Sequence, residues 1–252
     1  TDGAEGDVFG ISVAISGDTV VIGADLADEK GSNSGAAYVF SRSGNTWSQQ
    51  VKLTANDGAE GDLFGIRVTL SGDTAVIGAA REDGKGEDSG AAYVFVRSGS
   101  TWAQQAKLSA ADGAAHDRFG TRVALYGDSA VIGSILDDAM SENSGSAYLF
   151  TRSGSRWSQQ AKLTASDGAA DDVFGWSVSL YGDTVFIGLN APGANNHYLT
   201  AGGRNGEFDQ IASFRRFLLF ARDTIKFRKP MDPDIHWSAM SGHVSTFIVN
   251  GG

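Results

Sequence analysis

Apolar and polar residues alternate along most of the chain, in short runs separated by glycine-containing turns. In the first stretch four runs have the length and the β-branched and aromatic content of strands. They are ISVAI (11–15), TVVIGA (19–24), AAYVFSR (36–42) and WSQQVKLTA (47–55). Ser-Gly-Asp (16–18) and Ser-Gly-Asn (43–45) form tight links, because glycine and Asp/Asn accept the positive φ of a short hairpin. The pattern predicts four antiparallel strands with a longer connection, 25–35, in the middle.

This four-strand unit recurs with a fixed period. A Phe-Gly pair returns every 55 residues, at Phe9-Gly10, Phe64-Gly65, Phe119-Gly120 and Phe174-Gly175. A constant period of this size indicates a repeat architecture. Alternating short and long connections are typical of a β-propeller blade. A β-sandwich is the alternative, but it gives no reason for a strict period. We therefore expect an all-β fold of propeller-type blades over 1–188, with repeats 8–62, 63–117, 118–172 and a partial repeat 173–188.

The Phe-Gly pair, the valine that follows it and the V-I-G-A strand end resemble the FG-GAP repeats of integrin α-subunit-type β-propellers, in the compact form of many bacterial secreted proteins. The resemblance covers 1–188. It implies a propeller fold and, for function, binding of proteins or glycans at surfaces.

The sequence departs from the integrin type between the first two strands. The integrin-type calcium loop, D-x-D-x-D-G-x-x-D, is replaced here by tight turns with one carboxylate each: Asp18, Asp73, Asp128 and Asp183. One carboxylate cannot supply the six to eight oxygens that calcium takes. We therefore assign no metal and no cofactor, and calcium binding elsewhere on the loops stays an open alternative.

Composition limits the class of partner. The 252 residues include 20 Lys/Arg and 30 Asp/Glu, a net charge of −10, which argues against a nucleic-acid partner. The absence of cysteine excludes disulfides, zinc–thiolate sites and a thiol nucleophile. No apolar run is long enough for a transmembrane segment. We expect an extracellular, cell-surface or periplasmic protein whose partner is another protein or a glycan.

The acidic residues concentrate in two kinds of connection. A meander places its turns alternately at the two ends of a sheet, so the long middle loops and the links between repeats share one face. A ligand-binding rim is expected there, formed by Asp57, Glu60, Asp62, Asp83, Asp88, Asp112, Asp117, Asp137 and Asp138. The alternative is that these residues only form turns and keep the protein soluble.

Two further features bear on function. The aromatic residues that recur in each repeat, such as Phe9, Tyr38, Phe40 and Trp47, are expected to pack between blades rather than to bind sugar. The four histidines show no metal-ligand spacing, and no nucleophile motif occurs. We therefore expect a protein that is not an enzyme.

The tail, 189–252, breaks the repeat and is slightly basic. Asn205 can cap a helix and Pro230 can end it, and apolar residues between them recur at helical spacing. A helix is predicted over 206–228, with a partner-docking surface formed by Phe214, Arg215, Phe217, Leu218 and Phe220. The alternative is two strands, 213–221 and 223–229, that complete the fourth blade. Three and a half repeats do not close a ring, which leaves closure to the tail, to another chain or to further repeats.

These observations favour a non-enzymatic extracellular or surface β-propeller that mediates protein or glycan binding or adhesion. A structural accessory subunit of a larger, multi-subunit assembly, docked through the C-terminal segment, is the alternative. A hydrolase or lyase that acts on glycans is the second alternative, since scattered carboxylate pairs leave no linear motif.

Overall fold

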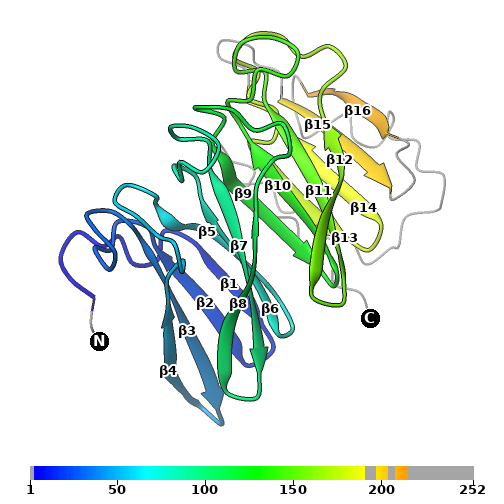
Figure 1. The fold of residues 1–252 in the computed structure, drawn as a ribbon. Helices are drawn as coiled ribbons and strands as arrows, with labels where there is room; N and C mark the ends of the chain where they lie inside the picture. Colours follow the sequence, from blue (N-terminus) through cyan, green and yellow to red (C-terminus); the bar gives the residue numbers. More distant parts are fainter. Residues whose placement is uncertain (1–2, 191–196, 204–207, 215–252) are drawn as a thin grey trace.

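A computed structural model of the chain describes residues 3–190, 197–203 and 208–214, with side chains described through Asn190. All the strands in these residues belong to four antiparallel sheets of four strands each, and within each sheet the strands neighbour one another in chain order (Figure 1). We call the sheets blades 1 to 4. The predicted all-β, four-stranded repeat is confirmed.

The strand bounds repeat closely from blade to blade. Blade 1 contains β1 (Val13–Ser16), β2 (Thr19–Ala24), β3 (Ala36–Ser43) and β4 (Thr46–Leu53). Blade 2 contains β5 (Phe64–Ser71), β6 (Thr74–Ala79), β7 (Ala91–Ser98) and β8 (Thr101–Leu108). Blade 3 contains β9 (Phe119–Tyr126), β10 (Ser129–Ser134), β11 (Ser146–Ser153) and β12 (Arg156–Leu163). Blade 4 contains β13 (Ser177–Tyr181), β14 (Thr184–Gly188), β15 (His197–Gly203) and β16 (Phe208–Phe214).

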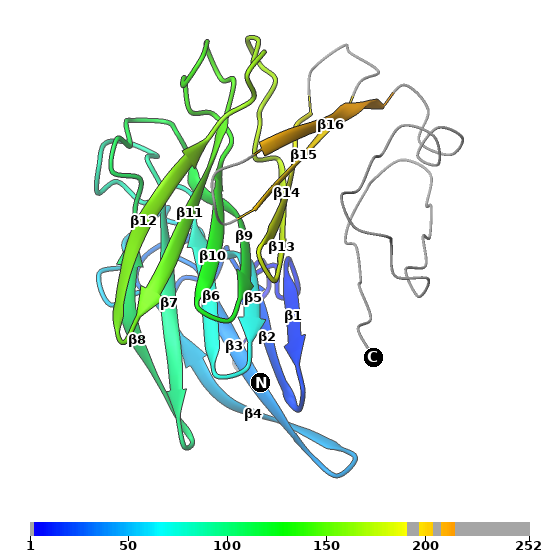
Figure 2. The same ribbon diagram turned by 90° about the vertical axis from the view of Figure 1, so that its right-hand side faces the viewer.

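Successive blades stack on one another in chain order (Figures 1 and 2). The second strand of each blade lies against the first strand of the next, so that β2 contacts β5, β6 contacts β9 and β10 contacts β13. The core of the protein therefore lies between blades, and blades 2 and 3 each bury one face against the blade before and the other against the blade after.

The recurring aromatic residues of blades 2 and 3 lie in these interfaces, as predicted, whereas Phe9 and Trp47 of blade 1 are 51% and 40% exposed. Phe64 meets Tyr93 and Phe95 edge-to-face, with ring centroids 5.5 Å and 5.9 Å away. All three belong to one buried cluster with Val21 and Val39 of blade 1. Phe119, Tyr148 and Phe150 of blade 3 form the same kind of cluster against blade 2. The aromatic sides of blades 2 and 3 thus pack on the aliphatic sides of the blades before them.

Glycine allows the backbones of neighbouring blades to come close. A Cβ atom on Gly23, Gly78 or Gly133 would lie 1.9, 2.0 or 2.5 Å from the carbonyl oxygen of Gly65, Gly120 or Gly175 in the next blade. These last three are the glycines of the Phe-Gly pairs, and their φ values of +91° to +99° suit glycine. The phenylalanine of the Phe-Gly pair therefore packs between the blades, and the carbonyl of its glycine lies against the α-carbon of a glycine in the preceding blade.

The fourth blade corrects one prediction about the tail. Residues 208–214, at the start of the helix expected over 206–228, form strand β16, and the boundary expected after Gly188 falls between β14 and β15. Strand pairing satisfies the backbone of β16 against β15, while a helix here would leave the sheet edge open. The other residues of the expected helix lie outside the described residues. Of the alternative strands 213–221 and 223–229, residues 213 and 214 fall in β16, and the rest lie outside the described residues. None of the described residues belongs to a helix long and apolar enough to cross a membrane.

Candidate functional site

The long loops between second and third strands lie beside the links that connect the blades. The backbone N–H groups of Gly61 and Leu63, in the link to blade 2, donate to the carbonyls of Ser32 and Asn33 in the loop of blade 1, at 2.9 Å and 3.1 Å. The same bonds recur between later blades. The predicted gathering of loops and links on one face is confirmed, and we call this surface the loop face.

Two of the predicted carboxylates form the turn that leads into each blade. Asp62 accepts a hydrogen bond from the N–H of Ala59 at 2.8 Å, and Asp117 accepts one from Ala114 at 2.7 Å. Both aspartates are buried. Burial, together with the nearby carboxylates of Glu82, Asp83 and Asp57, raises the pKa of Asp62 to about 6, although the hydrogen bond from Ala59 acts in the opposite direction. Burial likewise raises the pKa of Asp117.

Two other predicted carboxylates close the long loops. Asp83 accepts a hydrogen bond from the N–H of Asp88, and Asp138 accepts one from Asn143, at 2.8 Å and 2.7 Å. Asp88 and Asn143 have φ values of 54° and 51°, a left-handed conformation that Asn and Asp tolerate better than most residues. These aspartates therefore hold the loops in shape.

In each of the middle blades a lysine bridges two carboxylates. Lys107 contacts Asp57 at 2.6 Å and Glu82 at 2.7 Å. Burial alone would raise the pKa of Asp57, but the hydrogen bonds from Lys107, Tyr93 and the backbone and the charge of Lys107 together outweigh it, and the net shift of the pKa is downward. Glu82 is buried, and its carboxylate charge would destabilise the fold without the ammonium of Lys107 beside it.

Blade 3 repeats this arrangement. Lys162 contacts Asp112 at 2.7 Å and Asp137 at 2.9 Å, and the Tyr148 hydroxyl donates to Asp137 at 2.6 Å. Asp112 also has a lowered pKa, because the hydrogen bonds from Lys162, the backbone and Tyr148 and the charge of Lys162 together outweigh the effect of burial. The lysine ammonium also lies over the Tyr148 ring, 5.5 Å from its centroid. Asp112 and Asp137 are thus bound into the blade.

The last two of the nine predicted carboxylates differ from each other. Asp88 lies 3.6 Å from Arg118 and 4.0 Å from Arg81, so two arginines offset its charge. Glu60 is exposed on the link between blades 1 and 2. In blades 2 and 3 the rim of acidic side chains is therefore mainly a structural network of turns and ion pairs.

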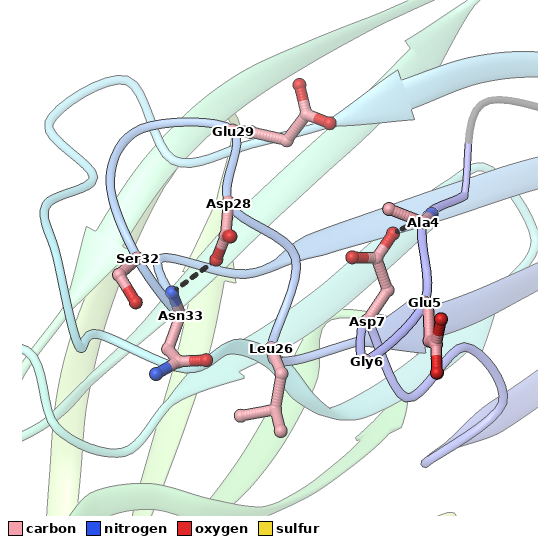
Figure 3. Close-up of a pocket in the computed structure, with 9 residues that line it drawn as sticks. All are labelled: Ala4, Glu5, Gly6, Asp7, Leu26, Asp28, Glu29, Ser32 and Asn33. Atoms are coloured by element: carbon pink, nitrogen blue, oxygen red, sulfur yellow. Dashed lines mark hydrogen bonds between the residues drawn. The ribbon is translucent and has the colours of Figure 1, made fainter.

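Blade 1 has an open pocket on the loop face (Figure 3). Its volume is about 390 Å³, and it lies between the turn 4–7 and the loop that follows β2. Three exposed carboxylates line it, from Glu5, Asp28 and Glu29, together with the buried Asp7. Asp7 accepts from the N–H of Ala4 at 2.7 Å and Asp28 from that of Asn33 at 2.8 Å.

Sequence reasoning missed this pocket. It took its candidates from the second and third repeats, although a shift of 55 residues aligns Asp7 with Asp62 and Asp28 with Asp83. Within the described residues, no cluster of three or more His, Cys, Asp or Glu side chains could hold a metal ion. Of the predicted docking residues in the tail, Phe214 ends β16 and its side chain is not described. Arg215, Phe217, Leu218 and Phe220 lie outside the described residues.

A basic pair, which the sequence did not suggest, lies on the first strands of blades 2 and 3. Arg67 and Arg122 both have lowered pKa values, that of Arg122 about 10, because burial disfavours the charged form. Arg67 also lowers the pKa of Arg122 through charge repulsion. Arg122 stacks over the Trp176 ring at 4.7 Å, a contact that compensates part of this cost.

Stacked four-stranded antiparallel blades with a Phe-Gly pair at every junction define a repeat protein of the β-propeller type. The FG-GAP repeat family matches residues 1–40, 47–95, 102–150 and 157–205, and the chain belongs to this family. The fourth match extends past Gly188 into β15, in agreement with the fourth sheet. A comparison with curated protein sequences finds no match.

Proposed function

We propose that the protein is a non-enzymatic module that binds another macromolecule through its loop face and works outside the cell, at the cell surface or in the periplasm. The acidic pocket of blade 1 carries the proposal. It is open, and its lining carboxylates are not part of the lysine clusters of blades 2 and 3. Glu29 contacts a lysine of its own blade, Lys52.

The chemistry of the pocket favours a protein ligand over a glycan. Glu5 and Asp28 offer carboxylates to solvent, which suits a lysine or arginine side chain of a partner. The nine lining residues include no aromatic ring on which a sugar could stack. Binding residues on a loop that is held by a rigid sheet are common in proteins, and the loops here are fixed by several hydrogen bonds.

A binding titration with a lysine-rich peptide tests this proposal. The double variant Glu5→Gln/Asp28→Asn removes two pocket charges and keeps an oxygen at position 28 for the N–H of Asn33. The matched control, Asp18→Asn/Asp73→Asn, removes two exposed carboxylates from the β1–β2 and β5–β6 turns. We expect the pocket variant to weaken peptide binding about tenfold and the control to leave it nearly unchanged. Equal weakening by both variants would mean that only the overall charge attracts the peptide.

A further inference from the structure

Blade 1 leaves exposed the face that every later blade buries. Its first strand and the segment before it present Phe9, Val13 and Ile15 to solvent, with exposed fractions of 51%, 58% and 64%. The equivalent residues of blade 2, Phe64, Val68 and Leu70, are 1%, 7% and 8% exposed. We call this face of blade 1 the incoming face.

Backbone and polar groups on the incoming face also lack the contacts that recur at the other junctions. The N–H groups of Leu63 and Phe64 donate to the loop of blade 1 at 3.1 Å, whereas those of Val8 and Phe9 have no such partner among the described residues. A Cβ atom on Gly65 would lie 2.2 Å from a carbonyl of blade 1, but one on Gly10 would meet nothing within 4 Å.

An arginine shows the same difference. Arg97 bonds to Asp73 of its own blade and also donates to the Thr19 hydroxyl of the preceding blade at 2.8 Å. Arg152 does the same with Asp128 and Thr74, at 2.8 Å and 2.9 Å. Arg42, at the equivalent position of blade 1, is found bonded to Asp18 within the described residues. It is half exposed and oriented as its counterparts are.

Blade 4 presents the complementary groups. Thr184 corresponds to Thr19 and Thr74, yet it is exposed where they are buried. Phe186 corresponds to Val21 and Val76, whose side chains are fully buried against the next blade, yet it is only half-buried. Gly188 lies where Gly23 and Gly78 receive the carbonyl of the next Phe-Gly pair. We call this the outgoing face.

We propose that the incoming face of one chain docks on the outgoing face of blade 4 in a second copy, and so repeats the junction that the chain makes three times internally. Phe186 would pack against Phe9, Val13 and Ile15, and Arg42 would donate to Thr184. A contact between two different faces either closes into a ring or continues as a filament. Two copies of four blades give eight, within the range of known propellers, so a closed pair is expected.

Analytical ultracentrifugation over a concentration series tests the proposal. We expect a species of twice the 26.3 kDa chain mass at high concentration. Ile15→Lys on the incoming face and Phe186→Lys on the outgoing face should each raise the dissociation constant about 30-fold or more. Met140→Lys adds the same charge at an exposed apolar residue of the blade 3 loop and should have no effect. A wild-type chain that stays monomeric, or variants that associate as well as the wild type, would overturn the proposal.

Mixing the two variants distinguishes head-to-tail docking from other contacts. Each variant keeps one intact face. An equimolar mixture should therefore form pairs in which the intact outgoing face of the Ile15→Lys chain binds the intact incoming face of the Phe186→Lys chain. If the incoming faces instead met each other, Phe186→Lys alone would still pair, and that result overturns the proposal. Arg42→Gln and Thr184→Val, which alter exposed side chains, provide milder variants and should each raise the dissociation constant about tenfold.

Discussion

Truncation of equivalent phenylalanines in different blades should have very different costs. Phe119 is 1% exposed and packs edge-to-face on Tyr148 and Phe150, in a cluster that includes Val76 of blade 2. Phe119→Ala should therefore lower the free energy of unfolding by about 3–5 kcal/mol, the usual cost for a buried phenylalanine. Phe9 has similar ring contacts, 5.2 Å and 6.3 Å from Tyr38 and Phe40, but it is 51% exposed.

Because about half of its surface already faces water, Phe9→Ala should cost about 1–2 kcal/mol. The measurement is equilibrium unfolding in urea, followed by circular dichroism, at protein concentrations low enough to keep the chain monomeric. The difference between the two variants, about 2–3 kcal/mol, is the contribution of the preceding blade. Equal losses for both variants would refute the claim that the core lies between blades.

Three further predictions follow from individual contacts. Gly78→Ala places a methyl group 2.0 Å from the Gly120 carbonyl and should lower the free energy of unfolding by at least about 2 kcal/mol, whereas Gly72→Ala, with open space but φ of +57°, should lower it by about 1 kcal/mol. Chemical denaturation measures both, and equal losses would contradict the close approach of the blades. Lys107→Met leaves the buried Glu82 without its cation and should lower the free energy of unfolding by about 2 kcal/mol, whereas Lys107→Arg keeps a cation and should lose much less. An unchanged free energy of unfolding in Lys107→Met would show that the ion pair is not needed. The pKa of Asp62 is raised to about 6, so its stabilising contribution is full below pH 3.8 and is lost as the pH rises through 6. The melting temperature of Asp62→Asn, compared with that of the wild type at the same pH, should therefore be higher at pH 7 than at pH 4, and a difference that does not change with pH would contradict this.

Much of the fold could be predicted because the same four-strand pattern recurs along the sequence. The strands of the first repeat were predicted within two residues of β1 to β4, since apolar alternation and Gly-Asp turns agree there. The helix predicted at 208–214 was wrong for a physical reason. Its apolar residues fit a helical spacing, but the edge of β15 offers backbone partners that local propensity does not take into account.

The candidate site was harder to predict. Acidic residues in loops can bind a ligand or hold a turn, and the sequence does not separate the two. The contacts do: Asp62 and Asp83 bond to backbone N–H groups, and Asp57 and Asp137 bond to lysines. The pocket of blade 1 could not be predicted from the sequence, because periodicity makes the equivalent positions of every repeat look alike. Arg67 and Arg122 are brought together only by stacking of successive first strands.

Hydrogen–deuterium exchange, measured at low and at high protein concentration, tests whether each blade docks on the next through one recurring junction. The amides of Leu63, Phe64, Arg118 and Phe119 bond to the preceding blade and should exchange slowly at both concentrations. The amides of Val8 and Phe9 should exchange fast in dilute solution and become protected when the chain is concentrated. Exchange of Val8 and Phe9 as slow as that of Leu63 and Phe64 in dilute solution, or equally fast at both concentrations, would show that this junction does not protect them.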